Sequence, residues 1–219
     1  MKKLFLLTLL SSLAGGAQAQ TAIKAGTVQL GGNVGYWHTS SEAPGNTSGY
    51  YPTKSTTINS QFVVAPSVGY FVADNLAVGI SGAYKATHDE YRQSSSATSS
   101  LKTKQYQVGA FVQYYKMVSE QFGFTGTLGG GYQYLGQPYN YGSSTLVSKG
   151  LYANIIPSVV FFPIPKLAIG ASIGGISYAS YNYDSPAGFN SSDSYESSTF
   201  GASFGLSQLL FSGTYYFGR

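Results

Sequence analysis

The chain has 219 residues, of which only 9% are charged, with 28 glycines, no cysteine and a formal net charge of +4. A soluble domain usually carries about 25% charged residues, so this composition argues against an ordinary water-facing surface. The lack of cysteine excludes disulfides, thiolate metal ligands and a catalytic thiol. The lysines and arginines beyond the N-terminus form no run, which argues against nucleic acid as a partner.

The first 19 residues have the three parts of a secretory signal peptide. Lys2 and Lys3 form a positive n-region, residues 4–13 are apolar, and Ala17-Gln18-Ala19 matches a signal-peptidase site. The apolar run is too short to span a bilayer, which takes about 20 residues. We therefore expect a cleaved signal over residues 1–19 and a single domain over residues 20–219.

The rest of the chain alternates apolar with small or polar residues. In residues 62–70, for example, Phe62, Val64, Val68 and Tyr70 share one parity. This two-residue period is typical of a strand with lipid on one face and a packed polar lumen on the other. The pattern predicts eight strands, at residues 27–39, 56–72, 76–91, 101–117, 122–135, 148–162, 167–183 and 198–217.

The connections alternate between short and long. The short ones are residues 73–75, 118–121 and 163–166, and the long polar ones are residues 40–55, 93–100, 136–147 and 184–197. Short periplasmic turns and long extracellular loops are typical of bacterial outer-membrane barrels. The predicted fold class is therefore all-β, an eight-stranded antiparallel up-and-down transmembrane β-barrel.

Three positions do not fit a regular strand. Pro66 and Pro157 lie on the lipid parity of predicted strands, where proline removes a ladder donor, so we expect a bulge or a skipped hydrogen bond at each. Phe204 and Leu206 have the opposite parity from Phe211, which predicts a bulge near residues 209–210.

Aromatic residues gather at two levels, as expected for the interfacial girdles of a barrel. The predicted girdle near the turns comprises Tyr70, Phe71, Tyr114, Phe122, Phe161, Phe162, Tyr215 and Phe217. The predicted girdle near the loops comprises Tyr36, Trp37, Tyr84, Tyr106, Tyr132, Tyr152 and Tyr178.

A family resemblance rests on the hairpins APSVGYFVADNLAVGISGAY and VGAFVQYYKMVSEQFGFTGTLGGGYQY and on the ending GTYYFGR. These segments resemble small porin-like outer-membrane β-barrels of the Bacteroidota type, and the chain resembles the OmpA transmembrane domain and OmpX-like barrels. The resemblance implies a monomer in the cell outer membrane, inserted by the barrel assembly machinery and surrounded by outer-membrane lipid and lipopolysaccharide. It implies no cofactor and no shared catalytic residues. The family's insertion signal ends on an aromatic residue, whereas here Gly218 and Arg219 follow Phe217.

The lumen is the main candidate site. The predicted lumen-facing polar residues are Gln29, Asn33, Lys85, Gln105, Gln107, Gln113, Gln133 and Asn154. An eight-stranded barrel has an interior that side chains can just fill, or that holds one small ligand. We favour a hydrogen-bonded plug, and with it a structural or surface-interaction role without catalysis. The alternative is a narrow porin-like channel or a small-ligand cavity for polar solutes.

Catalysis and metal binding have weaker support. His88-Asp89-Glu90 precedes a serine-rich loop and could belong to a Ser–His–acid site of a lipid A-modifying enzyme, but we favour a solvated strand end above the membrane. His38 and His88 lack an evident third metal ligand. The predicted loops are rich in serine, tyrosine, asparagine and glycine, which suits an extracellular partner of unknown identity.

Overall fold

A computed structural model describes residues 22–44, 54–93, 99–138, 145–183 and 195–218. Its elements are β1 (Val28–Pro44), β2 (Lys54–Ala73), β3 (Leu76–Gln93), β4 (Ser99–Met117), β5 (Phe122–Pro138), β6 (Thr145–Ile164), β7 (Leu167–Ser172), β8 (Gly174–Tyr183), β9 (Tyr195–Phe204), a 3₁₀ turn η1 (Leu206–Gln208) and β10 (Leu210–Phe217). None of the helical residues in the described part belongs to a helix long and apolar enough to cross a membrane.

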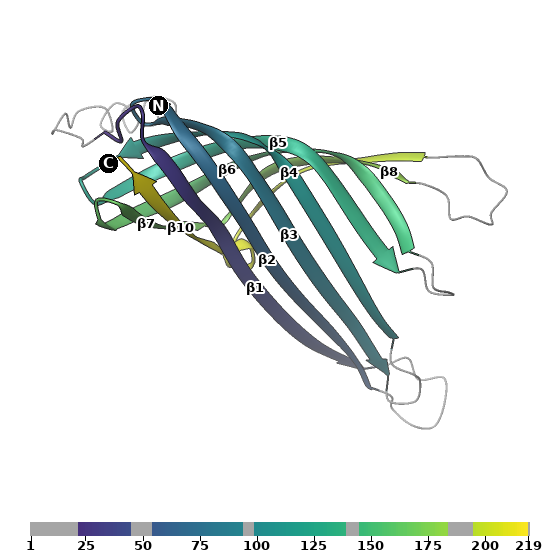
Figure 1. The fold of residues 1–219 in the computed structure, drawn as a ribbon. Helices are drawn as coiled ribbons and strands as arrows, with labels where there is room; N and C mark the ends of the chain where they lie inside the picture. The colour runs from purple at the N-terminus through teal and green to yellow at the C-terminus, as the bar shows by residue number, and fades with distance from the viewer. Residues whose placement is uncertain (1–21, 45–53, 94–98, 139–144, 184–194, 219) are drawn as a thin grey trace, which may run out of the picture.

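The strands form a closed antiparallel ring in which each strand pairs with its neighbour in sequence (Figure 1). β7 with β8 and β9 with β10 are two interrupted strands, so the ten segments make eight strands, and β10 closes the ring on β1. The predicted fold class is confirmed. β1 begins and β10 ends beside the short turns, because Val28 pairs with Phe217.

The register fixes the tilt of the strands. From Val34 the ladder leads through β2 to β5 and reaches β6 at Lys149. In the other direction it leads through β10 and β7 and reaches β6 at Val159. This ten-residue offset, from 149 to 159, is the shear of the barrel, and with eight strands it leaves a lumen that side chains can nearly fill.

Both prolines lie where a ladder is interrupted, as predicted. β2 pairs with β3 at Val64 and again at Ser67, but not at Pro66. Pro157 faces the junction between β7 and β8, where the register on β6 shifts by one residue and Gly174 has a φ of 113°. Only glycine adopts such a φ without strain, so this bulge depends on Gly174.

The predicted irregularity in the last strand is also present. β9 ends at Phe204, the five residues from Gly205 to Leu209 leave the ladder through η1, and β10 begins at Leu210. The interruption returns Phe211 to the outward parity, where it is 54% exposed.

The upper part of the ring is divided beside this interruption. β1 pairs with β10 only as far as Val34, and in the described residues its remainder, residues 35–44, pairs only with β2. Among the strands that the structure describes, β9 pairs only with β8. Figure 1 shows β1 and β2 running to one side of the barrel and β8 to the other. The periplasmic half of the wall is thus continuous, and the extracellular half is split between β1 and β9.

Candidate functional site

Four aromatic doublets stand at the periplasmic ends of the strands that run toward the turns. They are Tyr70-Phe71, Tyr114-Tyr115, Phe161-Phe162 and Tyr215-Tyr216. The first member of each faces outward and is 40–53% exposed, whereas the second faces inward and is at most 2% exposed. Adjacent residues of a strand point to opposite faces, so each doublet supplies one ring to the outer surface and one to the lumen.

The inward rings close the periplasmic end of the barrel. Six side chains at this end belong to one buried cluster, and we call them the floor. They are Ile23, Phe71, Tyr115, Met117, Phe162 and Tyr216. The ring centroids of Phe71 and Tyr115 are 5.5 Å apart, and those of Phe162 and Tyr216 are 5.4 Å apart. The assignment of Phe71 and Phe162 to a membrane girdle was therefore wrong, because the alternation turns both rings into the interior.

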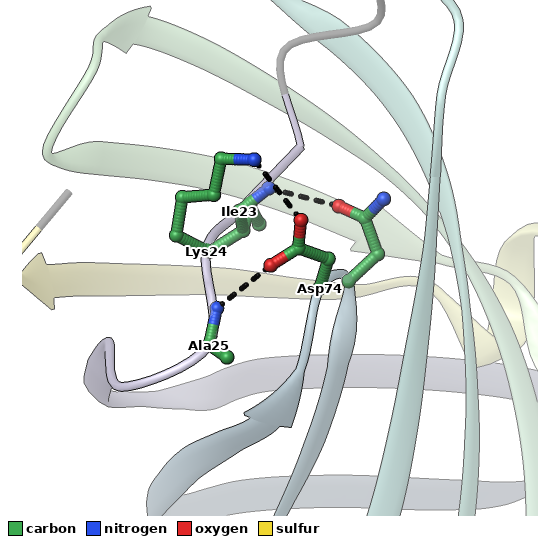
Figure 2. A network of polar contacts seen from close by, with 5 residues as sticks. Ile23, Lys24, Ala25 and Asp74 are labelled. Atoms are coloured by element: carbon green, nitrogen blue, oxygen red, sulfur yellow. Dashed lines mark hydrogen bonds and ion pairs between the residues drawn. The ribbon is translucent and has the colours of Figure 1, made fainter.

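The N-terminal segment is attached to the turn between β2 and β3 by a network of polar contacts (Figure 2). The backbone N–H of Ile23 donates to Asn75 Oδ1 at 2.9 Å, and the N–H of Ala25 donates to Asp74 Oδ1 at 3.0 Å. Lys24 Nζ lies 3.0 Å from Asp74 Oδ2. The Ala25 N–H, and then Lys24, hold the pKa of Asp74 below its ordinary value. These contacts place the fully buried Ile23 side chain in the periplasmic mouth.

Polar side chains cover the inner surface of the floor. The Tyr115 hydroxyl lies 2.9 Å from Gln29 Oε1, 3.0 Å from Gln113 Oε1 and 3.0 Å from the Tyr216 hydroxyl. Gln29 Nε2 donates to Gln113 Oε1 at 3.0 Å. The four side chains are linked by hydrogen bonds in one network, which holds both tyrosines and both glutamines in place relative to one another.

A second polar cluster, the upper glutamine cluster, lies higher in the lumen. Gln105 and Gln107 each donate from Nε2 to Gln133 Oε1 at 3.1 Å, and the Tyr181 hydroxyl donates to the same oxygen at 3.2 Å. Gln133 Nε2 in turn donates to the Leu151 carbonyl at 3.0 Å, and Gln133 is 1% exposed. This cluster fills the lumen on the side of β4, β5 and β8.

A chamber of about 250 Å³ lies above the floor. Its lining includes five of the predicted lumen residues, namely Gln29, Asn33, Gln107, Gln113 and Asn154. Gln105 and Gln133 belong to the upper glutamine cluster, and Lys85 lies on the inward parity of β3 outside the chamber lining, opposite Val63 and Gln105.

The sequence analysis missed the aromatic members of the site. The chamber lining includes three tyrosines that were not predicted to be in the lumen, Tyr115, Tyr152 and Tyr216. The assignment of Tyr152 to the girdle near the loops was wrong, because its ring lines the chamber. The doublets contain the signal that would have found Tyr115 and Tyr216, because two consecutive aromatics in an alternating strand cannot both face lipid.

The histidines do not form the constellation proposed for lipid modification. His38 Nδ1 lies 2.9 Å from Ser60 Oγ, whereas His88 Nε2 lies 4.0 Å from Glu90 Oε2, and Glu90 pairs with Arg92 at 2.7 Å. Ser60 and Glu90 therefore contact different histidines, and no Ser–His–acid chain is formed among the residues that the structure describes; residues 94–98 of the serine-rich loop lie outside them. No group of three or more potential metal ligands occurs in the described residues.

Three solved structures, of two proteins, are similar to this chain in their strand arrangement. The outer membrane protein OprG from Pseudomonas aeruginosa has 16% identity and a TM-score of 0.47, over 90% of this chain and 98% of that chain. Ail, the attachment invasion locus protein of Yersinia pestis, has 16% identity and a TM-score of 0.38, over 88% and 99%. Ail in complex with the heparin analogue sucrose octasulfate has 17% identity and a TM-score of 0.40, over the same shares. No family model and no curated protein matches.

The ring of strands defines the class without these similarities. Eight antiparallel strands meander around a closed barrel, their outward residues are apolar and their inward residues are small or polar. Only a closed ring of strands or a helix satisfies the backbone within lipid. The chain has the fold of a small outer-membrane β-barrel.

Proposed function

We propose that this protein is a non-conducting barrel of the cell outer membrane, with a structural or surface-interaction role and no catalysis. The observation that carries this proposal is the floor, whose six side chains are each at most 2% exposed and pack together across the periplasmic end of the barrel. The narrow channel, the alternative for small polar solutes, needs these side chains to move.

The extracellular ends of β1 to β4 support the surface role. Beyond Tyr36 the outward apolar residues of β1 give way to His38 and then to serine and glutamate, and β2 to β4 are similarly polar at these ends. Each strand continues past the apolar band, because a tilted membrane strand needs only about 9–11 residues. The polar extension offers a surface to an extracellular partner.

The outer rim supports contact with phosphate-bearing outer-leaflet lipid, including lipopolysaccharide. The rings of Tyr84 and Tyr106 are 5.2 Å apart on the outward parity. Lys104 lies two residues beyond Tyr106 on the same face, followed by Lys102, and both are exposed. Replacing both lysines with glutamine should weaken co-purification of lipopolysaccharide, whereas replacing Lys116 and Lys166 at the turn end should not. Equal retention by both double variants argues against this rim.

The export signal and the insertion route remain part of the proposal. Residues 1–19 lie outside the described part of the chain, and the Bacteroidota assignment stays a prediction from the sequence. Fractionation should recover the protein in the outer membrane as a heat-modifiable monomer whose N-terminal residue is Gln20.

Conductance of the full mature barrel in a planar lipid bilayer tests the main proposal. With insertion confirmed by heat-modifiable mobility on a gel, we expect a silent membrane. Reproducible single-channel steps from the unaltered protein would overturn the non-conducting role and favour the channel.

A further inference from the structure

The chamber above the floor is lined by uncharged side chains. Its lining contains no lysine, arginine, aspartate or glutamate. It consists of hydroxyl, amide and small apolar groups. Moving an ion into such a site would cost far more than moving a neutral polar molecule, because no opposite charge is present to offset desolvation.

Two amides of the chamber lining, those of Asn33 and Asn154, differ from the glutamine amides that also line it, because the glutamines are hydrogen-bonded within the two clusters. Gln29 and Gln113 bond to each other, and Gln133 accepts from Gln105. Within the described residues, the side chains of Asn33, Asn154 and Tyr152 have no hydrogen-bond partner although all three line the chamber. Each primary amide offers two donors and two lone pairs, and the phenol offers one donor.

The chamber lies directly beneath the division of the wall. Asn33 pairs with Ser212 one step below Val34, the last β1 residue that pairs with β10. A Cβ built on Gly35 would lie 2.5 Å from the Trp37 ring and 2.6 Å from Leu210, so these two side chains meet at the edge of the chamber. Leu210 also lines it. The level at which the pairing of β1 with β10 ends therefore lies beside the chamber, with Trp37 close to the lining residue Leu210.

We infer that the chamber binds a small uncharged polyhydroxylated ligand of about the size of one sugar ring. Its volume is just below the usual range of ligand pockets, about 300–1,000 Å³, which excludes oligosaccharides. The amides of Asn33 and Asn154 exchange hydrogen bonds with ligand hydroxyls, and Tyr152 supplies a hydroxyl and an aromatic edge. The ligand enters from the extracellular side between β1 and β9 and stops at the floor.

Fluorescence of Trp37 provides the test, because it is the single tryptophan of the chain. The refolded full-length mature protein is titrated with glucose, galactose, ribose and myo-inositol, and with inorganic phosphate as the charged comparison. We expect a saturable change with at least one of the four neutral probes and none with phosphate. No saturable change and no calorimetric heat with all four, or saturation by phosphate alone, overturns the inference.

Matched variants locate the site. Asn33→Ala and Asn154→Ala should each weaken binding at least tenfold, whereas Asn182→Ala, on the exposed part of β8, should leave it unchanged. Tyr152→Phe removes only a hydroxyl and should weaken binding several-fold if an asparagine variant fails to fold. Equal affinity in all of the folded variants contradicts the assignment.

The inference and the proposed function fail separately. If no probe binds while the bilayer stays silent, only the chamber site is lost. If the unaltered barrel conducts while a probe binds in the chamber, the non-conducting role is lost and the binding site stands.

Discussion

The periplasmic and extracellular halves of this barrel differ in strand pairing and in the packing of the lumen. In the periplasmic half the ladder is continuous, Val28 to Val34 pair on both sides, and the floor packs the lumen. In the extracellular half β1 and β9 each have one unpaired edge in the described residues. The half that lies wholly in lipid must satisfy its backbone internally, whereas the half that reaches water need not. The difference separates the part that anchors the protein from the part that can admit or contact something.

Removing a floor side chain should have the largest effect, because the floor is what distinguishes the packed periplasmic half from the extracellular half. Tyr216→Ala removes a side chain that is 0% exposed and contacts Phe71, Tyr115 and Phe162. We expect it to cost about 3–5 kcal/mol, as for other large aromatic-to-alanine changes in cores, and to make the barrel conduct. Urea unfolding and bilayer recordings measure both effects.

Tyr216→Phe is the matched control for the floor. It keeps the ring and removes only the hydroxyl that contacts Tyr115, so we expect a loss of about 1 kcal/mol and a silent bilayer. Conductance equal to that of Tyr216→Ala would show that the ring does not seal the barrel.

Packing in the closed half should also respond strongly to one added methyl group. A Cβ on Gly79 would lie 2.2 Å from the Val68 carbonyl oxygen and 2.6 Å from the Phe111 ring, whereas a Cβ on Gly213 would meet nothing within 4 Å. Gly79→Ala should therefore destabilise the barrel by about 1–3 kcal/mol. Gly213→Ala should be neutral or stabilising by up to about 1 kcal/mol. Similar urea midpoints for the two variants would mean that the wall relaxes freely around Gly79.

The sequence predicts the closed half better than the split half. Parity and turn chemistry are local, so the eight strands, the prolines at broken ladders and the irregularity before Leu210 follow from residues close in the chain. The doublets indicate locally that one ring of each pair faces the lumen, but no local pattern shows that rings from four strands and Ile23 meet across the barrel. Within the described residues the side chains of Asn33 and Asn154 form no hydrogen bond, and this likewise depends on which residues face them across the lumen. Sequence analysis found both residues but could not distinguish them from the bonded glutamines.

Hydrogen exchange should resolve the two halves directly. The amides of β1 beyond Val34 that point away from β2, and those of β9 that point away from β8, have no ladder partner in the described residues. We expect them to exchange much faster in detergent micelles than the amides of residues 28–34. Uniform protection along the whole of β1 would mean that β1 and β9 pair in the membrane and that the entrance to the chamber is closed.

Lowering the pH should have the smallest effect, confined to the contacts of the N-terminal segment with Asp74. The pKa of Asp74 is lowered in the folded protein by the Ala25 N–H and by Lys24. A carboxyl with a depressed folded pKa stabilises the fold above its unfolded pKa, and this contribution disappears as the pH falls through the folded pKa. We therefore expect the amides of Ile23 and Ala25 to lose protection as the pH falls below the ordinary range of aspartate and through the lowered pKa of Asp74, while those of β3 keep theirs. Asp74→Asn retains an acceptor for the Ala25 N–H but carries no charge for Lys24, so its protection should be lower at neutral pH and independent of pH in this range. If the unaltered protein shows no pH dependence either, Asn75, which accepts from Ile23, holds the segment in place without Asp74.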